Sequence, residues 1–322
     1  MKKLCLILVA AAAALFSSAL LADNYPSKPV TLVAVFGPGS ASDTITRVVA
    51  QPLGVALKQS VIVEARPGAN GAISAMYVAR APADGYTLLM TTNSPHSAAP
   101  FLMKNIAYDP VKDFTPVSRL GSFTLMLVVH PSIPAKSVKE LIELARSKPD
   151  QLSFGSSGVA TGTHLSGELF KVMTGVKMVH VPYPGSPQAV TDLLAGRIQV
   201  FFSPASTVLA HVREGKLVAL ASTEAKRTAA APELPTMAEA GLPGFDTGLW
   251  FGLLAPSGTP GEVIDKLARA ANAALESDEV VKALAPQGID LVGGSPADFA
   301  RYIDSEMKRW ATVAQAAGLK KP

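Results

Sequence analysis

The feature that most constrains the fold is an apolar, strand-like run that stops in a small-residue loop and restarts as an amphipathic helix. This unit occurs three times, and its loops are residues 37–43, 155–158 continuing to 161–163, and 184–187. Each loop places a helix N-terminus, with its free backbone N–H groups, at the end of a strand. No loop contains lysine or arginine, so the donors are amides and hydroxyls. Together they indicate a cradle for a small anion.

Residues 30–90 alternate between two hydrophobic patterns. Apolar runs at 30–36, 61–64 and 86–90 are separated by residues 42–57 and 71–79, where apolar side chains recur at helical spacing. Such alternation predicts a parallel sheet with helices on its faces and a ligand at the carboxyl ends of the strands. A second series runs from about residue 125 to 221. The sequence therefore predicts an α/β protein with two lobes, each a mostly parallel sheet flanked by helices, around a ligand cleft.

The last third of the chain contains predicted helices at 260–275 and 295–317 that have no sheet of their own. We expect them to return to the first lobe, which makes that lobe discontinuous. The expected lobes are residues 23–123 with 247–322, and residues 124–246. Hinges are expected near 122–125 and 245–250.

The N-terminus has the three-part pattern of a secretory signal. Two lysines precede an apolar stretch at 4–15, and small residues follow around 17–22. The stretch is shorter than the roughly 20 residues of a membrane-spanning helix. We expect residues 1–22 to form a signal peptide, cleaved after Ala19 or Ala22, and the mature protein to be periplasmic. The only cysteine, Cys5, lies inside this segment, so no disulfide is expected.

Charge and motif spacing argue against several functional classes. Removal of Lys2 and Lys3 from 29 basic residues leaves 27 against 25 acidic, with no block of like charges, so nucleic-acid binding is not indicated. Ser42 occupies the third glycine position of a dinucleotide fingerprint, and the loop lacks the terminal Gly-Lys of a Walker motif. The 5 histidines show no spacing typical of metal ligands. We expect no cofactor and no metal.

A serine hydrolase is the alternative that the loops leave open. A cleft serine would need His164 or His96 as its base, and no nearby carboxylate identifies itself as the partner that orients His164. The segment at 155–159 also has Val159 where a nucleophile elbow has glycine. No catalytic residue is therefore assigned, and binding is the leading class.

Several motifs, taken in order, resemble the periplasmic substrate-binding receptors of tripartite tricarboxylate transporters, also called the Bug family. They are the segments at 25–30, 37–43, 81–88, 154–170, 181–187 with 192–196, and 251–260. The resemblance covers essentially the whole mature chain, and its specificity comes from the order and spacing. It implies a two-lobed, type II periplasmic-binding-protein-like fold that closes on a small organic acid. The family more often has consecutive glycines where this chain has Gly39 followed by Ser40.

The loops and the resemblance together give an expected set of ligand-binding residues. These are Phe36, Gly37, Gly39, Ser40, Asp43, Asn93, Ser94, Ser156, Ser157, Thr161, Gly162, Thr163, Tyr183, Gly185, Ser186 and Ser203. The expected function is capture of a small organic anion by domain closure and delivery to the subunits of a two-component membrane permease. A receptor for the extracytoplasmic domain of a sensor kinase is the alternative partner assignment. We expect a monomer.

Overall fold

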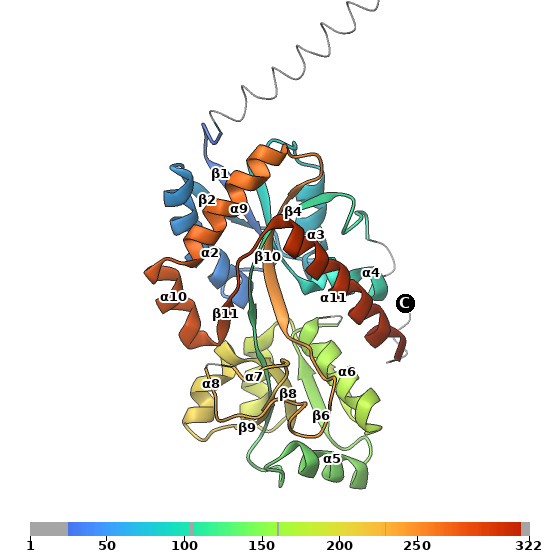
Figure 1. Ribbon diagram of the computed structural model, residues 1–322. Coiled ribbons are helices and arrows are strands. Elements are labelled where there is room, and N and C mark those ends of the chain that lie inside the picture. Colours follow the sequence, from blue (N-terminus) through green and yellow to red (C-terminus); the bar gives the residue numbers. More distant parts are fainter. Residues whose placement is uncertain (1–24, 104–105, 160, 229, 317–322) are drawn as a thin grey trace, which may run out of the picture.

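The structure is a computed structural model that describes residues 25–103, 106–159, 161–228 and 230–316. It is an α/β protein with two lobes, each built on one sheet with helices packed against it (Figure 1). The expected signal peptide, residues 1–22, lies outside the described residues. Within the described ranges, no helix is both long and apolar enough to cross a membrane.

The first lobe contains a six-stranded sheet in the order β11-β4-β10-β3-β1-β2. Its strands are β1 (Val30–Ala34), β2 (Val61–Ala65), β3 (Thr87–Thr92), β4 (Phe114–Phe123), β10 (Leu249–Pro256) and β11 (Ile289–Leu291). Its helices are α2 (Ala41–Leu57), α3 (Ala72–Ala79), α4 (Ala99–Leu102), α9 (Gly261–Leu275), α10 (Asp278–Leu284), α11 (Pro296–Ala316), and the short η1 (Ala69–Gly71), η2 (Ser94–Ala98, a π-helix) and η3 (Ala285–Gln287).

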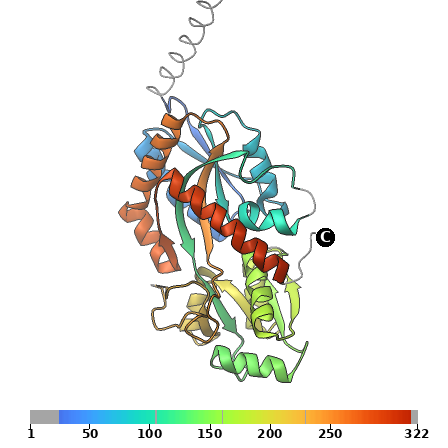
Figure 2. The same ribbon diagram turned by 45° about the vertical axis from the view of Figure 1, so that its right-hand side comes forward.

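Alternate side chains of the first sheet enter two apolar layers. Leu32 and Leu88 pack in the layer that includes α2 and α9, whereas Val33 and Leu89 pack in the layer that includes α3 and α11. Both C-terminal helices α9 and α11 contact β4. Figure 2 shows α11 running obliquely across this lobe toward the second. The sheet is therefore buried on both faces.

The second lobe contains a five-stranded sheet in the order β7-β6-β8-β5-β9. Its strands are β5 (Leu125–Val129), β6 (Ser153–Ser156), β7 (Val179–Pro182), β8 (Val200–Pro204) and β9 (Val218–Ser222). Its helices are α5 (Val138–Ser147), α6 (Gly162–Thr174), α7 (Ser186–Leu194) and α8 (Ala205–Arg213). Phe154, Phe170 and Phe202 are fully buried between β6, α6 and β8.

Both sheets are mixed rather than mostly parallel, which corrects the sequence-based expectation. β10 pairs antiparallel with β3 and β4, and β5 pairs antiparallel with β8 and β9. The reason is topological: β5 and β10 both begin at the junction of the lobes and run away from it, opposite to the strands that run toward it. The carboxyl ends of β1–β4 and of β6–β9 consequently face the space between the lobes.

Two chain segments join the lobes. The first is Thr124 between β4 and β5, whose N–H donates to Gly288 O and whose carbonyl accepts from Ala205 N–H. The second comprises residues 223–248 between β9 and β10, and it is tied to the first because Thr124 Oγ1 donates to Glu224 Oε2 at 2.6 Å. The two connections therefore lie side by side at the junction.

Candidate functional site

A cavity of about 560 Å³ lies between the two lobes, at the carboxyl ends of the strands. It is lined by Phe36, Gly37, Pro38, Gly39, Ser40, Ser42, Pro67, Gly68, Ala69, Asn70, Thr92, Asn93, Ser94, Phe123, Ser157, Thr161, Gly162, Thr163, Pro184, Gly185, Ser186, Pro187, Gln188, Pro204, Thr207 and Leu249. None of these described residues is acidic, basic or a histidine. Any charged ligand would therefore meet neutral groups only.

Four helices direct their N-termini at this cavity. The residues that precede α2, α6, α7 and α8 are Ser40, Thr161, Gly185 and Pro204, and all of them line it. Each helix N-terminus carries a partial positive charge of roughly half a unit and leaves its first N–H groups without helical partners. The cavity is thus electropositive although no cation lines it, which suits a small anion.

The first-lobe loop is held by hydrogen bonds among its own residues at the start of α2. Ser40 Oγ accepts from Asp43 N–H at 3.1 Å, so Ser40 is the N-cap of α2. Asp43 accepts from Gly39 N–H at 3.2 Å and from Arg47 Nε at 3.1 Å. The carboxylate is buried and does not line the cavity. Asp43 shapes the loop and lies behind it.

The loop that follows β3 contributes Thr92, Asn93 and Ser94. It continues into the π-helix η2, where His96 Nδ1 lies 2.6 Å from Thr91 Oγ1 and burial lowers the pKa of His96 to about 3. His96 is fully buried and does not line the cavity, which removes it as the base for a cleft serine. Asn93 Nδ2 and Ser42 Oγ are buried without a hydrogen-bond partner among the described residues, and both belong to lining residues. They are available to a ligand.

The second-lobe loop lines the cavity with a net of hydroxyl groups. Thr163 Oγ1 accepts from Ser157 N–H at 2.8 Å and lies 2.9 Å from Thr161 Oγ1. Thr161 Oγ1 donates to Gly158 O at 2.7 Å and caps α6. The loop keeps its shape through these bonds.

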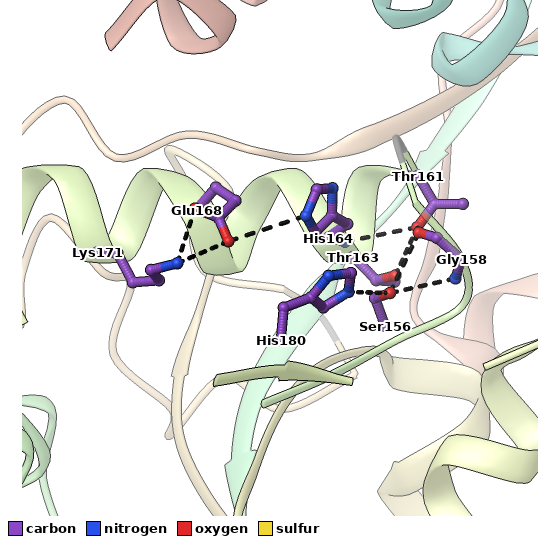
Figure 3. Close-up of polar contacts among 8 residues, drawn as sticks. All are labelled: Ser156, Gly158, Thr161, Thr163, His164, Glu168, Lys171 and His180. Atoms are coloured by element: carbon purple, nitrogen blue, oxygen red, sulfur yellow. Dashed lines mark hydrogen bonds and ion pairs between the residues drawn. The ribbon is translucent and has the colours of Figure 1, made fainter. Parts of the chain in front are cut away.

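Ser156 lies behind this loop in a buried polar cluster (Figure 3). Its Oγ is 2.6 Å from His180 Nε2 on β7, and the ring of His180 stacks on that of His164 with centroids 4.0 Å apart. Glu168 Oε1 is 3.8 Å from His164 Nε2, so this histidine has the local carboxylate that the sequence analysis did not identify. Lys171 Nζ donates to Glu168 Oε1 at 2.9 Å.

Both histidines of the cluster are poor bases. Burial, with a smaller effect of the Lys171 ammonium, lowers the pKa of His164 to about 4. Burial and the neighbouring His164 lower the pKa of His180 to about 4, against an opposing effect of Glu168. Both rings are therefore neutral at pH 7.

Two further expected residues have their hydroxyls engaged outside the cavity. Tyr183 donates to Asp192 Oδ2 on α7 at 2.9 Å, and burial together with this hydrogen bond raises the pKa of Tyr183 to about 12. Ser203 Oγ lies 2.8 Å from Thr207 Oγ1, and Thr207 rather than Ser203 lines the cavity.

The structure thus brings most of the expected residues together at one cavity. Those that line it are Phe36, Gly37, Gly39, Ser40, Asn93, Ser94, Ser157, Thr161, Gly162, Thr163, Gly185 and Ser186. Asp43, Ser156, Tyr183 and Ser203 stand behind it. Sequence analysis missed the loop at 67–70, which follows β2 and carries the same Gly/Pro signal as the other loops. It also missed Thr92, Phe123, Gln188, Pro204, Thr207 and Leu249.

Comparison with known proteins shows which family the chain is related to. A profile described as "Tripartite tricarboxylate transporter family receptor" matches residues 45–319. Protein BugT of Bordetella pertussis is 38% identical over 300 residues, which cover 93% of this chain and 92% of BugT.

Solved structures with the same fold include two that hold carboxylates. The Rpa4515 protein of R. palustris with adipate is 39% identical, with a TM-score of 0.86 over 92% of this chain and 100% of that one. MatC from Rhodopseudomonas palustris with bound malate is 32% identical, with a TM-score of 0.81 over 90% of this chain and 99% of that one.

The fold and the interlobe cavity define a two-lobed solute-binding protein of the periplasmic type. The chain belongs to the family of tripartite tricarboxylate transporter receptors, which includes the Bug proteins. The sequence-based assignment to this family is confirmed.

Proposed function

We propose that the protein binds a small organic carboxylate in the interlobe cavity. The observation that carries this proposal is the convergence of four helix N-termini on a cavity that no described ionisable side chain lines. The free amides and hydroxyls would hold the carboxylate oxygens, while Phe123 and Leu249 would contact the carbon chain. The adipate and malate held by related structures support a dicarboxylate.

Lobe closure is the proposed mechanism. We assign the lobes to residues 23–123 with 247–322 and to residues 124–246, hinged at the two adjacent connections. Contacts that cross between lobes support a closed form: Asn70 Nδ2 donates to Val159 O at 2.7 Å, and Trp310 of α11 packs in one apolar cluster with Leu165 of α6. Ligand would stabilise this form because both lobes supply its donors.

The ligand would then be delivered to a tripartite tricarboxylate-type permease, after export to the periplasm and removal of residues 1–22. The family's transport role supports the permease as partner. A sensor kinase domain that docks on the same closed form is a second partner assignment, and the protein is proposed to act as a monomer.

We propose no covalent step. A hydrolase would need an accessible serine beside a base, whereas Ser156, which contacts His180, is fully buried behind the loop. Ser156 is also not among the residues that line the cavity, which supports binding rather than catalysis.

The test is a thermal-shift titration of refolded, ligand-free protein with adipate, malate, citrate and the uncharged adipamide. Saturable stabilisation by a carboxylate is expected, by about 2.7 kcal/mol at a free concentration of 100 times Kd. Adipamide should give no shift, since it lacks the anionic charge that the helix N-termini attract. NMR of the recovered ligand should show it unchanged. A larger shift with adipamide than with adipate, or consumption of the ligand, would refute the proposal.

A further inference from the structure

The shape of the second-lobe loop depends on the peptide groups of Gly158. Ser156 Oγ accepts from Gly158 N–H at 3.2 Å, and Thr161 Oγ1 donates to Gly158 O at 2.7 Å. Gly158 has a φ of 129°, a conformation that other residues rarely adopt, so these bonds hold it in place. Ser157, Thr161 and Thr163, which line the cavity, are positioned by the same loop.

The Ser156 hydroxyl has one hydrogen and two possible acceptors. One is His180 Nε2 at 2.6 Å, and the other is Gly158 O at 3.1 Å. A neutral imidazole accepts at one nitrogen. When Ser156 donates to His180, its lone pairs remain for Gly158 N–H, and Gly158 O remains for Thr161. Gly158 O then accepts from the Oγ1 and the N–H of Thr161 and needs no third donor.

Loss of the acceptor at His180 would redirect the hydroxyl. Ser156 would turn its hydrogen to Gly158 O, where the Oγ1 and N–H of Thr161, the residue that caps α6, already occupy both lone pairs. A buried polar group deprived of its partner usually costs more than an ordinary hydrogen bond contributes. The loop would therefore lose definition on the side that faces the cavity.

We propose that His180 is a positioning residue for ligand binding: it acts through Ser156 to hold the loop residues 156–159 and 161–163 in the shape that binds the ligand. This inference rests on the proposed function. His180 does not line the cavity, and its ring is held by stacking on His164 and Phe154. The acceptor nitrogen is thus fixed relative to β6.

The test uses the full mature protein with four variants. His180→Phe keeps an aromatic ring but removes the acceptor, and His180→Gln restores a polar group near the position of Nε2. Ser156→Ala removes the intermediary, alone and combined with His180→Phe. The matched control is His130→Phe, because His130 Nδ1 lies 2.7 Å from Ser132 Oγ in the same lobe, just after the end of β5 that points away from the cavity.

The first readout is amide hydrogen exchange of residues 157–163 in ligand-free protein. Exchange should be about tenfold faster in His180→Phe and in Ser156→Ala, and within about twofold of wild type in His180→Gln and His130→Phe. The second readout is Kd for adipate and for malate, with a loss of about tenfold in the same two variants. The double variant should bind like Ser156→Ala alone, because the two residues act in series.

Two outcomes would overturn the inference. One is exchange in His180→Phe that matches wild type, and the other is a double variant whose loss multiplies the two single losses. Failure of the wild type to bind any carboxylate would instead refute the proposed function. The exchange measurement needs no ligand, so it tests the positioning role of His180 even when the proposed function fails.

Discussion

Two glycines with positive φ flank helix α6, and only one of them bears on the cavity. Gly158 precedes the helix with a φ of 129°, and Gly175 ends it with a φ of 69°. A Cβ on Gly158 would meet nothing closer than Thr161 Cγ2 at 3.5 Å, and one on Gly175 would meet nothing within 4 Å. Substitution at either site therefore costs backbone strain rather than a clash.

We predict that Gly158→Ala and Gly175→Ala separate stability from binding. Each should lower the free energy of unfolding by roughly 1–3 kcal/mol, the usual cost of a disfavoured backbone conformation. Only Gly158→Ala should weaken carboxylate binding, by at least about tenfold on the same energy scale, because the altered loop lines the cavity. Calorimetric Kd and thermal denaturation measure both effects. An equal loss of affinity in the Gly175 variant would contradict the assignment.

The stacked histidines predict a pH-dependent stability. The pKa values of His164 and His180 are about 4 in the folded protein, below the ordinary value of 6.5. The unfolded chain therefore binds more protons between pH 6.5 and about 4, and the free energy of unfolding falls as pH is lowered through this window. Above pH 6.5 the two residues contribute no slope.

Urea denaturation between pH 4.5 and 7.5 tests this prediction. His180→Gln removes one of the two groups, so its free energy of unfolding should fall less steeply than that of wild type below pH 6.5. Carboxylates elsewhere contribute equally to both proteins, and the difference isolates the histidine. Parallel curves for the two proteins would count against the prediction.

At the scale of elements, serine N-caps offer a paired test of the role of helix α2. Ser40 Oγ accepts from Asp43 N–H at 3.1 Å, and Ser137 Oγ accepts from Glu140 N–H at 3.2 Å at the start of α5. Ser40 lines the cavity, whereas Ser137 does not.

We predict that Ser40→Ala and Ser137→Ala each lower the free energy of unfolding by about 1 kcal/mol, the usual effect of losing an N-cap. Ser40→Ala alone should also weaken carboxylate binding, since the N-terminus of α2 faces the cavity. Titration calorimetry measures the change in affinity, and denaturation measures the change in the free energy of unfolding. If Ser137→Ala weakened binding as much, the effect would be a general loss of stability.

Much of each strand–loop–helix unit could be predicted because its signals are local. Apolar periodicity located β1, α2, β3 and α6, and the Gly/Ser loops supplied most of the cavity lining. The direction of β5 and β10 could not be predicted, because it follows from where the chain crosses between lobes. Side-chain direction was also beyond local signals: Tyr183 and Ser156 turn to Asp192 and His180, partners that only the folded chain brings near.

For the whole molecule, two contacts between the lobes lie away from the chain connections. Asn70, in a left-handed conformation with a φ of 53°, donates from the first lobe to Val159 O of the second. Elsewhere, Trp310 and Val313 of α11 share an apolar cluster with Leu165 of α6. These two contacts between the lobes thus comprise a polar one and an apolar one.

We predict that Asn70→Gly speeds dissociation of the ligand. Glycine keeps the left-handed backbone and removes the donor to Val159 O together with a side chain that lines the cavity, so the loss should be at least that of one hydrogen bond, about 1 kcal/mol or roughly fivefold in the dissociation rate. Under the proposed closure mechanism association begins from the open form, so its rate should change little. Stopped-flow measurement of both rates tests this, and an unchanged dissociation rate would show that Asn70 does not hold the lobes together.

The uncharged lining of the cavity also affects how readily the ligand specificity of such a receptor can change. The partial positive charge at the cavity comes from backbone groups that the fold fixes, so under the proposed function a new anionic ligand requires no new counter-charge. Phe123 and Leu249 are large apolar side chains that line the cavity at the junction, and we expect their size to limit the length of acid that fits. Smaller or larger side chains at Phe123 and Leu249 should give a set of variants that bind acids of different chain length.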